Sequence, residues 1–120
     1  MAGTVIVPWY ATGFRDNRFE EPLNEIAAVA LRYGASSWAV YRARDDRYKF
    51  QQLASFADHL DWQRYWDGPE MVEFRRRNAG HYQVLVTYVW HDELVSGALG
   101  PEVPLAEAQP EPEPEPTAAA

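Results

Sequence analysis

Two kinds of side chain in this sequence could take part in chemistry: histidines and a dense set of aromatic residues. His59 stands beside the densest aromatic run, which contains Trp62, Tyr65 and Trp66. A histidine can act as a general base because its ordinary pKa lies near neutral pH. We therefore take His59 as the candidate base, with Tyr65 as the second side chain that could handle a proton. The alternative for His59 is a capping or solvated position at the start of a helix.

The other two histidines cannot form a metal site with each other. His81 and His91 lie ten residues apart, on or beside a predicted strand. At about 3.3 Å per residue this separation is roughly 33 Å. A solvated position is the alternative for both, and His91, beside Asp92, ranks second to His59 as a base. We expect no metal site.

Aromatic residues from several parts of the sequence could together line a pocket for a flat hydrophobic ligand. The candidate ligand-binding residues are Trp9, Trp38, Trp62, Trp66 and Tyr88. They could equally fill the core and a dimer interface, where aromatic side chains contribute most. No nucleophile motif and no glycine-rich phosphate loop accompanies them.

The charge of the chain is unevenly distributed. Five of the 18 acidic residues lie beyond residue 100, so 13 precede it against 11 Lys and Arg. The body is therefore near neutral, which argues against a nucleic-acid partner. The single basic cluster, Arg75 to Arg77, falls where a helix should end, and cations there complement the helix dipole.

Cysteine and hydropathy patterns set the expected compartment. The sequence has no cysteine, which excludes disulfides and thiolate metal sites. No apolar run approaches the roughly 20 residues needed to span a bilayer, and the N-terminus lacks a basic region typical of a signal peptide. We expect a cytoplasmic protein that does not bind membranes.

The elements that must position these side chains can be predicted in order. Residues 4–11 predict a first strand with an edge, bulge or irregularity at Pro8, which has no N–H to donate. A helical stripe over 19–31 follows, with Pro22 expected in its first turn and Gly34 as its stop. Strands are predicted at 37–44 and 47–56, joined by a turn at Asp45-Asp46.

The second half of the domain is also predicted to consist of helix followed by strand. Asp58 can cap a short helix to Trp66, and Asp67-Gly68-Pro69 breaks it before a second helix to about Asn78. Residues 82–90 alternate as a last strand. The domain therefore spans residues 1–96. The Pro-, Glu- and Ala-rich segment 97–120 is predicted to be a disordered acidic tail, with a spacer role or a protein partner as its alternatives.

This order of elements predicts an α+β fold, a ferredoxin-like βαββαβ layer. The four-stranded antiparallel sheet would carry its helices on one face. Its other face is too apolar to stay exposed, so two sheets should pack face to face as a homodimer.

One segment carries a family resemblance. The sequence KFQQLASFADHLDWQRYWDGPEMVEF, residues 49–74, shows a strand, an acidic cap, a short aromatic helix, a small-residue break and a second helix. With the apolar first strand and the helix closing at Tyr33-Gly34, it resembles the antibiotic biosynthesis monooxygenase-like family of the dimeric α+β barrel superfamily. The resemblance covers about residues 4–93. It implies a dimeric α+β barrel.

Members of that family include cofactor-independent oxygenases of quinol-like aromatics and haem-degrading enzymes. The haem-degrading members use an Asn on the first strand and a His in the helix after the short one. Here residues 6–9 contain no Asn and residues 70–78 contain no His. The resemblance therefore favours a cofactor-free monooxygenase over haem binding or degradation.

Three functions are carried forward. The first is a cofactor-independent monooxygenase of quinol-like aromatic substrates in an aromatic-lined cavity. The second is a binding module that holds a small hydrophobic or aromatic ligand without turnover. The third is an accessory or structural dimer whose tail contacts a protein partner.

Overall fold

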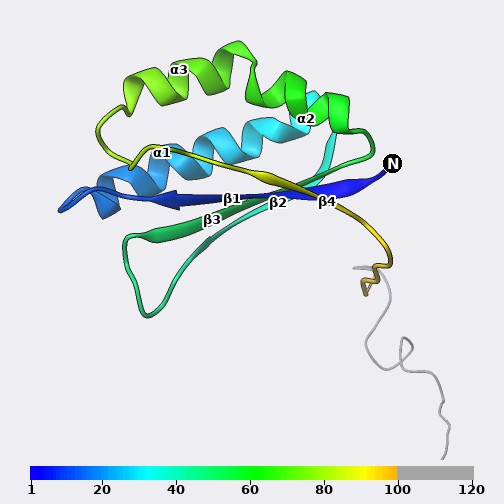
Figure 1. Cartoon of the computed structure of the whole chain (residues 1–120), viewed down its shortest axis with the longest axis horizontal. Coiled ribbons are helices and arrows are strands. Elements are labelled where there is room, and N and C mark those ends of the chain that lie inside the picture. The colour runs from blue at the N-terminus through cyan, green and yellow to red at the C-terminus, as the bar shows by residue number, and fades with distance from the viewer. Residues whose placement is uncertain (100–120) are drawn as a thin grey trace, which may run out of the picture.

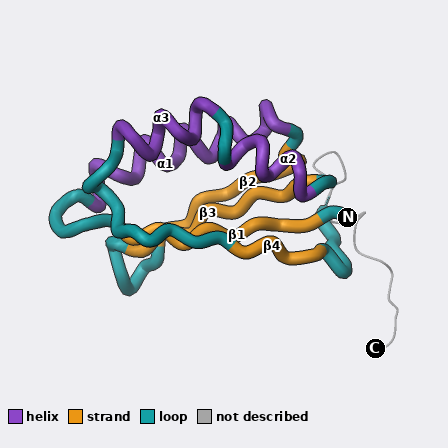
Figure 2. The backbone as a smooth tube through the Cα atoms, turned by 45° about the horizontal axis from the view of Figure 1, so that its top comes forward, coloured by secondary structure: helices purple, strands orange, loops and turns teal. Residues whose placement is uncertain are grey.

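Four antiparallel strands form one sheet in the order β2-β3-β1-β4, and the helices cover one of its faces (Figure 1, Figure 2). In the computed structural model the elements are β1 (Gly3–Tyr10), α1 (Asp16–Val29), a 3-10 helix η1 (Ala30–Tyr33), β2 (Ala35–Arg42), β3 (Lys49–Phe56), α2 (His59–Trp66), α3 (Pro69–Arg77) and β4 (Val89–Asp92). The structure describes residues 1–99, so the predicted tail lies outside the described residues from residue 100 on. This arrangement confirms the predicted α+β, ferredoxin-like layer.

Alternation along the strands separates a core face from an open face. Val5, Val7 and Trp9 of β1 are fully buried beneath the helices, as are Phe50 and Phe56 of β3. The opposite side chains form what we call the open face, across which one apolar row and one polar row run in register. The apolar row is Ala39, Leu53, Ile6 and Val89, and the polar row is Ser37, Ser55, Thr4 and His91.

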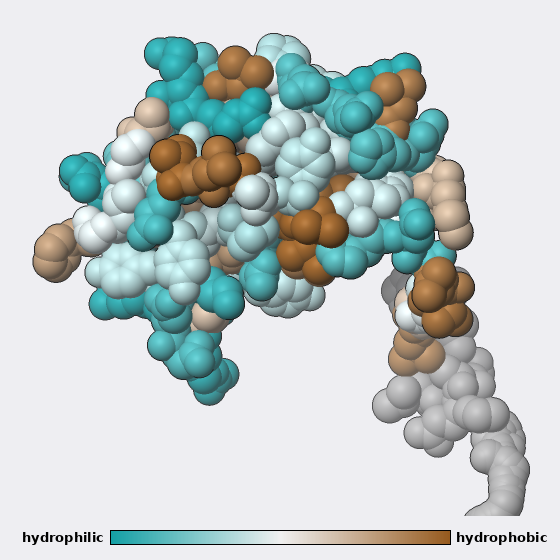
Figure 3. Space-filling view, in the orientation of Figure 1, coloured by the Kyte–Doolittle hydropathy of each residue, from teal (hydrophilic) through white to brown (hydrophobic). Residues whose placement is uncertain are grey.

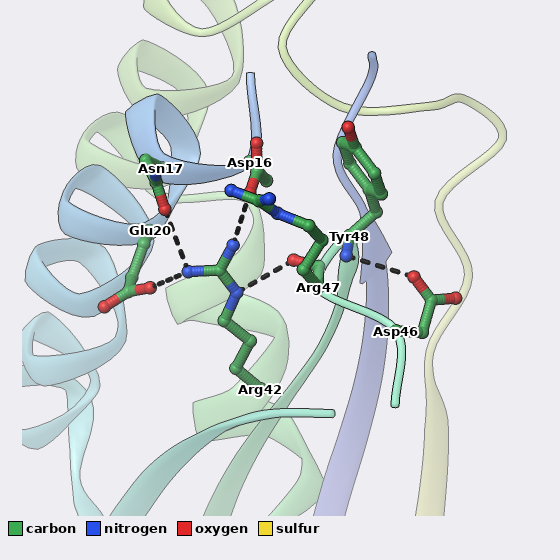
Figure 4. A network of polar contacts seen from close by, with 7 residues as sticks. All are labelled: Asp16, Asn17, Glu20, Arg42, Asp46, Arg47 and Tyr48. Carbon is green, nitrogen blue, oxygen red and sulfur yellow. Dashed lines mark hydrogen bonds and ion pairs between the residues drawn. The ribbon is translucent and has the colours of Figure 1, made fainter. Parts of the chain in front are cut away.

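The helix α1 begins earlier than the sequence pattern indicates. It starts at Asp16, so Pro22 lies inside the helix and the prediction that Pro22 occupies its first turn is wrong. The reason is a tertiary contact: the Asp16 carboxylate is buried and accepts hydrogen bonds from Arg42 Nη2 and Arg47 Nε, each at 2.6 Å (Figure 4). These two arginines, from β2 and from the turn after it, fix the helix start before Pro22, at the cost of one backbone donor.

The last strand is shorter than predicted. Only Val89–Asp92 pair with β1, and Tyr82 forms an isolated bridge to Ala11. Between these two contacts the alternation predicted for residues 82–90 is interrupted. The prediction of one strand over that range is therefore wrong for residues 83–88.

Pro8 explains this interruption. Tyr10 O accepts from Gln83 N at 2.7 Å, whereas Ala11 N donates to Tyr48 O on the β3 side. Backbone groups alternate sides along a strand, so Pro8, two residues before Tyr10, also faces the last segment. Because Pro8 has no N–H, the ladder lacks a donor there. The irregularity predicted at Pro8 is confirmed. It lies in residues 83–88, which would otherwise pair with this part of β1.

The two short helices follow the prediction. The Asp58 carboxylate caps α2 by accepting from Leu60 N at 3.2 Å, and Pro69 occupies the first turn of α3. Gly68 cannot be replaced without a clash, because an added Cβ would lie 2.7 Å from the Tyr33 hydroxyl. The break at Asp67-Gly68-Pro69 therefore lets α2 and α3 follow each other over the sheet.

Asp16→Asn should lower the midpoint of thermal unfolding at neutral pH, because Arg42 and Arg47 would then face an uncharged amide. Burial by itself raises the pKa of Asp16, but the hydrogen bond from Arg47, the backbone hydrogen bond and the charges of Arg47 and Arg42 outweigh it and hold that pKa below the ordinary 3.8. A lowered folded-state pKa means that the stabilisation is complete above the ordinary value and is lost as the pH falls below it.

The difference in midpoint between wild type and Asp16→Asn should therefore be constant from about pH 7 to 5 and shrink towards pH 3. Glu20→Gln is the matched control, because it removes a more exposed carboxylate from the same Arg42 and should shift the midpoint less. A difference that does not change with pH would contradict this account.

Candidate functional site

One side of α2 meets the last segment of the chain in a row of aromatic contacts. His59, Trp62 and Trp66 share that side because they follow at three- and four-residue steps. The Tyr88 ring lies 5.0 Å from Trp62 and 5.3 Å from Trp66, and the Trp90 ring lies 4.9 Å from His59. We call these five side chains, His59, Trp62, Trp66, Tyr88 and Trp90, the aromatic seam.

The seam runs from the core to the surface. Trp62 is fully buried and stacks on Trp66 at 5.3 Å, whereas Trp66 and Tyr88 are half-buried. The Arg75 guanidinium lies 4.5 Å from the Trp66 ring centre and donates to Trp66 O at 3.1 Å. A cation over an aromatic face is favourable and also holds the ring in place.

Trp9 continues the seam into the core. Its ring lies 6.0 Å from Trp66 and makes edge contacts with Phe74 at 5.6 Å and Tyr82 at 5.1 Å. The structure therefore brings four of the five predicted ligand-binding residues together. The fifth, Trp38, lies on the edge strand β2, where it is 38 % exposed and lines a separate hollow of about 230 Å³ with Leu53.

The indole N–H of Trp62 has no hydrogen-bond acceptor among the described residues, although its side chain is fully buried. Buried donors are nearly always paired, because an unpaired one loses its hydrogen bond to water without replacement. This donor is enclosed by the rings of Phe56, Tyr65, Trp66 and Tyr88. It is the one feature of the seam that points to an external acceptor.

The Tyr65 hydroxyl is committed to a different contact. It donates to Ile26 O at 2.6 Å and accepts from Gln52 Nε2 at 2.9 Å, while Gln52 Oε1 accepts from Trp9 Nε1 at 3.0 Å. Burial raises the pKa of Tyr65 well above its ordinary value, with only partial opposition from the Gln52 hydrogen bond. The predicted catalytic role of Tyr65 stays a prediction, and this geometry favours a structural role.

The predicted cavity between sheet and helices is occupied by the rings themselves. None of five hollows on the described surface is lined by Trp9, Trp62, Trp66 or Tyr88. A ligand could enter the seam only if Tyr88, on the segment that lacks strand pairing, moved aside. The ligand-binding role of these residues therefore also stays a prediction.

Sequence reasoning missed two residues that hold the site. Gln52 is a polar residue of the core face that was not predicted. Its position between Phe50 and Ala54 in the alternation of β3 does place it on that face. The sequence predicts Arg75 to complement the helix dipole, and its helical spacing with Met71 also permits an inward position, but neither pattern identifies its contact with Trp66. Within residues 1–99, no group of three or more His, Cys, Asp or Glu side chains could hold a metal ion, and no helix could span a membrane.

Comparison with known proteins finds the same architecture in solved structures but no match by sequence. No family model and no curated protein matches the sequence. Among solved structures, a putative antibiotic biosynthesis monooxygenase from Nitrosomonas europaea superposes with a TM-score of 0.71 at 15% identity, over 78% of this chain and 90% of that one. SnoaB from Streptomyces nogalater, a cofactor-independent oxygenase, gives 0.68 at 17% identity, over 79% and 95%.

A putative antibiotic biosynthesis monooxygenase from Bordetella bronchiseptica gives a TM-score of 0.68 at 10% identity, over 78% of this chain and 98% of that one. The chain therefore has the fold of the antibiotic biosynthesis monooxygenase-like proteins, and the resemblance seen in the sequence is confirmed at the level of the fold. Identities this low carry the fold alone.

Tyr65→Phe should lower the free energy of unfolding by about 1–3 kcal/mol, because it leaves Ile26 O and the Gln52 amide without a buried partner. Chemical denaturation followed by tryptophan fluorescence measures this change. Tyr41→Phe is the matched control, because Tyr41 is 60% exposed and should show almost no effect. Unchanged stability of Tyr65→Phe would refute the structural role.

Proposed function

We propose that this protein is a homodimeric, cofactor-independent monooxygenase of flat, electron-rich aromatic substrates such as quinols and anthrones. The observation that carries the proposal is the buried, unpaired Trp62 N–H within the aromatic seam. A quinol-like ligand combines an aromatic surface with an oxygen acceptor, so it would satisfy both properties of the seam. The fold supports the same class, since SnoaB is described as a cofactor-independent oxygenase.

The substrate would replace Tyr88 against Trp62 and Trp66. Its ring would stack on these indoles, and its oxygen would accept the hydrogen bond from Trp62 Nε1. A single hydrogen bond in an otherwise apolar site fixes the orientation of the ligand, and only one polar group of the ligand has to lose its water. Arg75, already held at Trp66, would limit the sideways movement of the bound ring.

His59 is the proposed base. It lies one helical turn before Trp62 on the same side of α2 and is half-buried against Trp90. Removing a proton from the substrate gives a carbanion that can reduce O₂ directly. For an anthrone, the ring CH₂ and O₂ give a ring carbonyl and water, so the substrate supplies all the electrons. The protein contributes the base, the orientation and a site that excludes water.

The open face supports the homodimer. Its apolar row crosses all four strands. Val89 in this row is 55% exposed, and Tyr41 beside the row is 60% exposed. An apolar row that continues across a whole sheet face, bordered by a polar row, is typical of an interface with an apolar centre and a polar rim. Two copies packed through it would form the closed barrel that the sequence predicts.

Binding without turnover is the second candidate. It is favoured by the commitment of the Tyr65 hydroxyl to the core, which leaves His59 as the only predicted proton acceptor at the seam. Both candidates require the same ligand contacts. They differ in whether oxygen is consumed.

Trp62→Phe should weaken binding of a naphthoquinol or an anthrone by about threefold to tenfold, since a neutral hydrogen bond contributes about 0.5–1.5 kcal/mol. The ring is retained, so the fold should survive. Titration under nitrogen, followed by tryptophan fluorescence, measures the dissociation constant. Trp38→Phe is the control and should leave it unchanged, because Trp38 lies away from the seam. Equal affinities for all three proteins would rule out Trp62 as the anchor.

His59→Asn should abolish oxygen uptake while changing the dissociation constant of the anaerobic complex little. An oxygen electrode with an anthrone as substrate provides the rate. Turnover by the wild type that persists in His59→Asn would remove His59 from the mechanism. Binding by the wild type with no oxygen uptake at all would favour the second candidate.

A further inference from the structure

One side of α1 carries a charge pattern that the fold does not use. Arg15, Arg18, Pro22, Glu25 and Val29 follow at three- and four-residue steps from the residue before α1 to its last residue. They therefore form a single stripe, which lies beside the buried side of the helix and borders α3. The stripe is positive at its beginning and negative towards its end.

This charge order is unfavourable for an isolated helix. Cations weaken a helix near its N-terminus, and α1 has no basic residue in its last turn. The side chains of Arg15, Arg18 and Glu25 make no ion pair or hydrogen bond within residues 1–99. By contrast, Asp16 and Glu20 on the other side of the helix are both paired with Arg42 (Figure 4).

An exposed aromatic residue lies at the positive end of the stripe. Phe14 is 95% exposed and has a φ of 63°, a left-handed conformation that is uncommon for a bulky side chain. It lines a shallow hollow with Arg15 and Arg18. An exposed, strained aromatic residue flanked by unpaired cations is typical of a contact residue.

A matching receptor lies at the other end of the same stripe. A hollow of about 310 Å³ runs between α1 and α3, with an apolar floor and an acidic residue that has no partner, Glu25, on its rim. Its apolar lining is Pro22, Ile26, Val29 and Phe74. The remaining lining residues besides Glu25 belong to α3 and its end, namely Glu70, Glu73, Arg77 and Asn78, and Glu73 is paired with Arg76 and Arg77. The hollow therefore offers apolar contact to an aromatic ring and a carboxylate to a neighbouring cation.

We propose that two copies of this chain pair through α1, with the two helices antiparallel about a two-fold axis. Arg18 of each copy lies opposite Glu25 of the other. The same pairing places Phe14 opposite Val29, because both pairs are centred between Glu21 and Pro22. Each copy thus supplies both the ring and the hollow, as a two-fold contact requires.

A second copy fits this stripe better than an unrelated partner for an electrostatic reason. Antiparallel pairing sets the positive end of one stripe against the negative end of the other. It also opposes the two helix dipoles, so both unfavourable features of the isolated helix are relieved together.

The α1 contact lies on the helix side of the sheet, away from the open face. It therefore adds to the sheet-mediated dimer and does not compete with it. If the unit being paired is a monomer, pairing through α1 gives a dimer. If the unit is the sheet-mediated dimer, it carries two α1 helices on opposite outer faces and is linked to a neighbour through each of them. The inference consequently does not depend on the proposed oxygenase function.

Sedimentation velocity on the full chain tests the pairing. Arg18→Glu and Glu25→Arg should each lower the mass of the assembly to that of the unit that lacks the α1 contact, because each sets like charges opposite one another. The double variant Arg18→Glu/Glu25→Arg should restore the wild-type mass, since the pair is re-formed with its charges exchanged. Phe14→Ser, at a side chain that makes no core contact, should lower the mass in the same way, and about 0.5 M salt should weaken the wild-type assembly.

Circular dichroism of each variant confirms that the fold is retained. Equal masses for the wild type and both single variants would overturn the proposal and leave the stripe for a different partner. Failure of the double variant to recover the wild-type mass would overturn the Arg18–Glu25 pairing.

Discussion

A buried chain of hydrogen bonds links all the layers of this fold. Trp9 of β1 donates to Gln52 of β3, Gln52 donates to Tyr65 of α2, and Tyr65 donates to a carbonyl of α1. Every member has a partner, so a polar group enters the core without an unpaired donor or acceptor. Two of its members also contact the aromatic seam, since the Trp9 ring lies 6.0 Å from Trp66 and the Tyr65 ring lies 5.6 Å from Trp62. The seam can therefore keep its geometry although it has no covalent or metal-based constraint in residues 1–99.

The two faces of the sheet serve different purposes. The core face is closed by aromatic rings, whereas the open face presents polar and apolar rows in register across all four strands. On the outer surface the hydrophobic residues are dispersed among polar ones in the view of Figure 3. The apolar row and the aromatic seam therefore lie on opposite faces of the sheet, so the proposed dimer contact and the proposed ligand site can be altered independently.

Local patterns were enough to predict the first three strands, the capped helix α2 and the break at Gly68, because caps, turns and alternation act over a few residues. They did not predict the gap in pairing at residues 83–88, which depends on the neighbouring strand. The start of α1 could not be predicted, because it depends on Arg42 and Arg47, which arrive from β2 and the turn after it. The role of Gln52 was within reach of the alternation. That the aromatic rings fill the space between the sheet and the helices could not be predicted, because residue spacing does not determine how tightly rings pack.

Pro8 has a consequence for how the molecule moves. Because its missing donor leaves residues 84–88 outside the ladder between β1 and β4, the backbone of the segment that carries Tyr88 is paired only at its two ends. Between them the segment is held by side-chain packing, such as that of Tyr88 on Trp62 and Trp66. Its amides should exchange with solvent through a local opening far cheaper than global unfolding. The aromatic seam can then open without unfolding of the domain. Under the proposed function, this local opening, rather than the stability of the domain, would set the rate at which a substrate reaches Trp62.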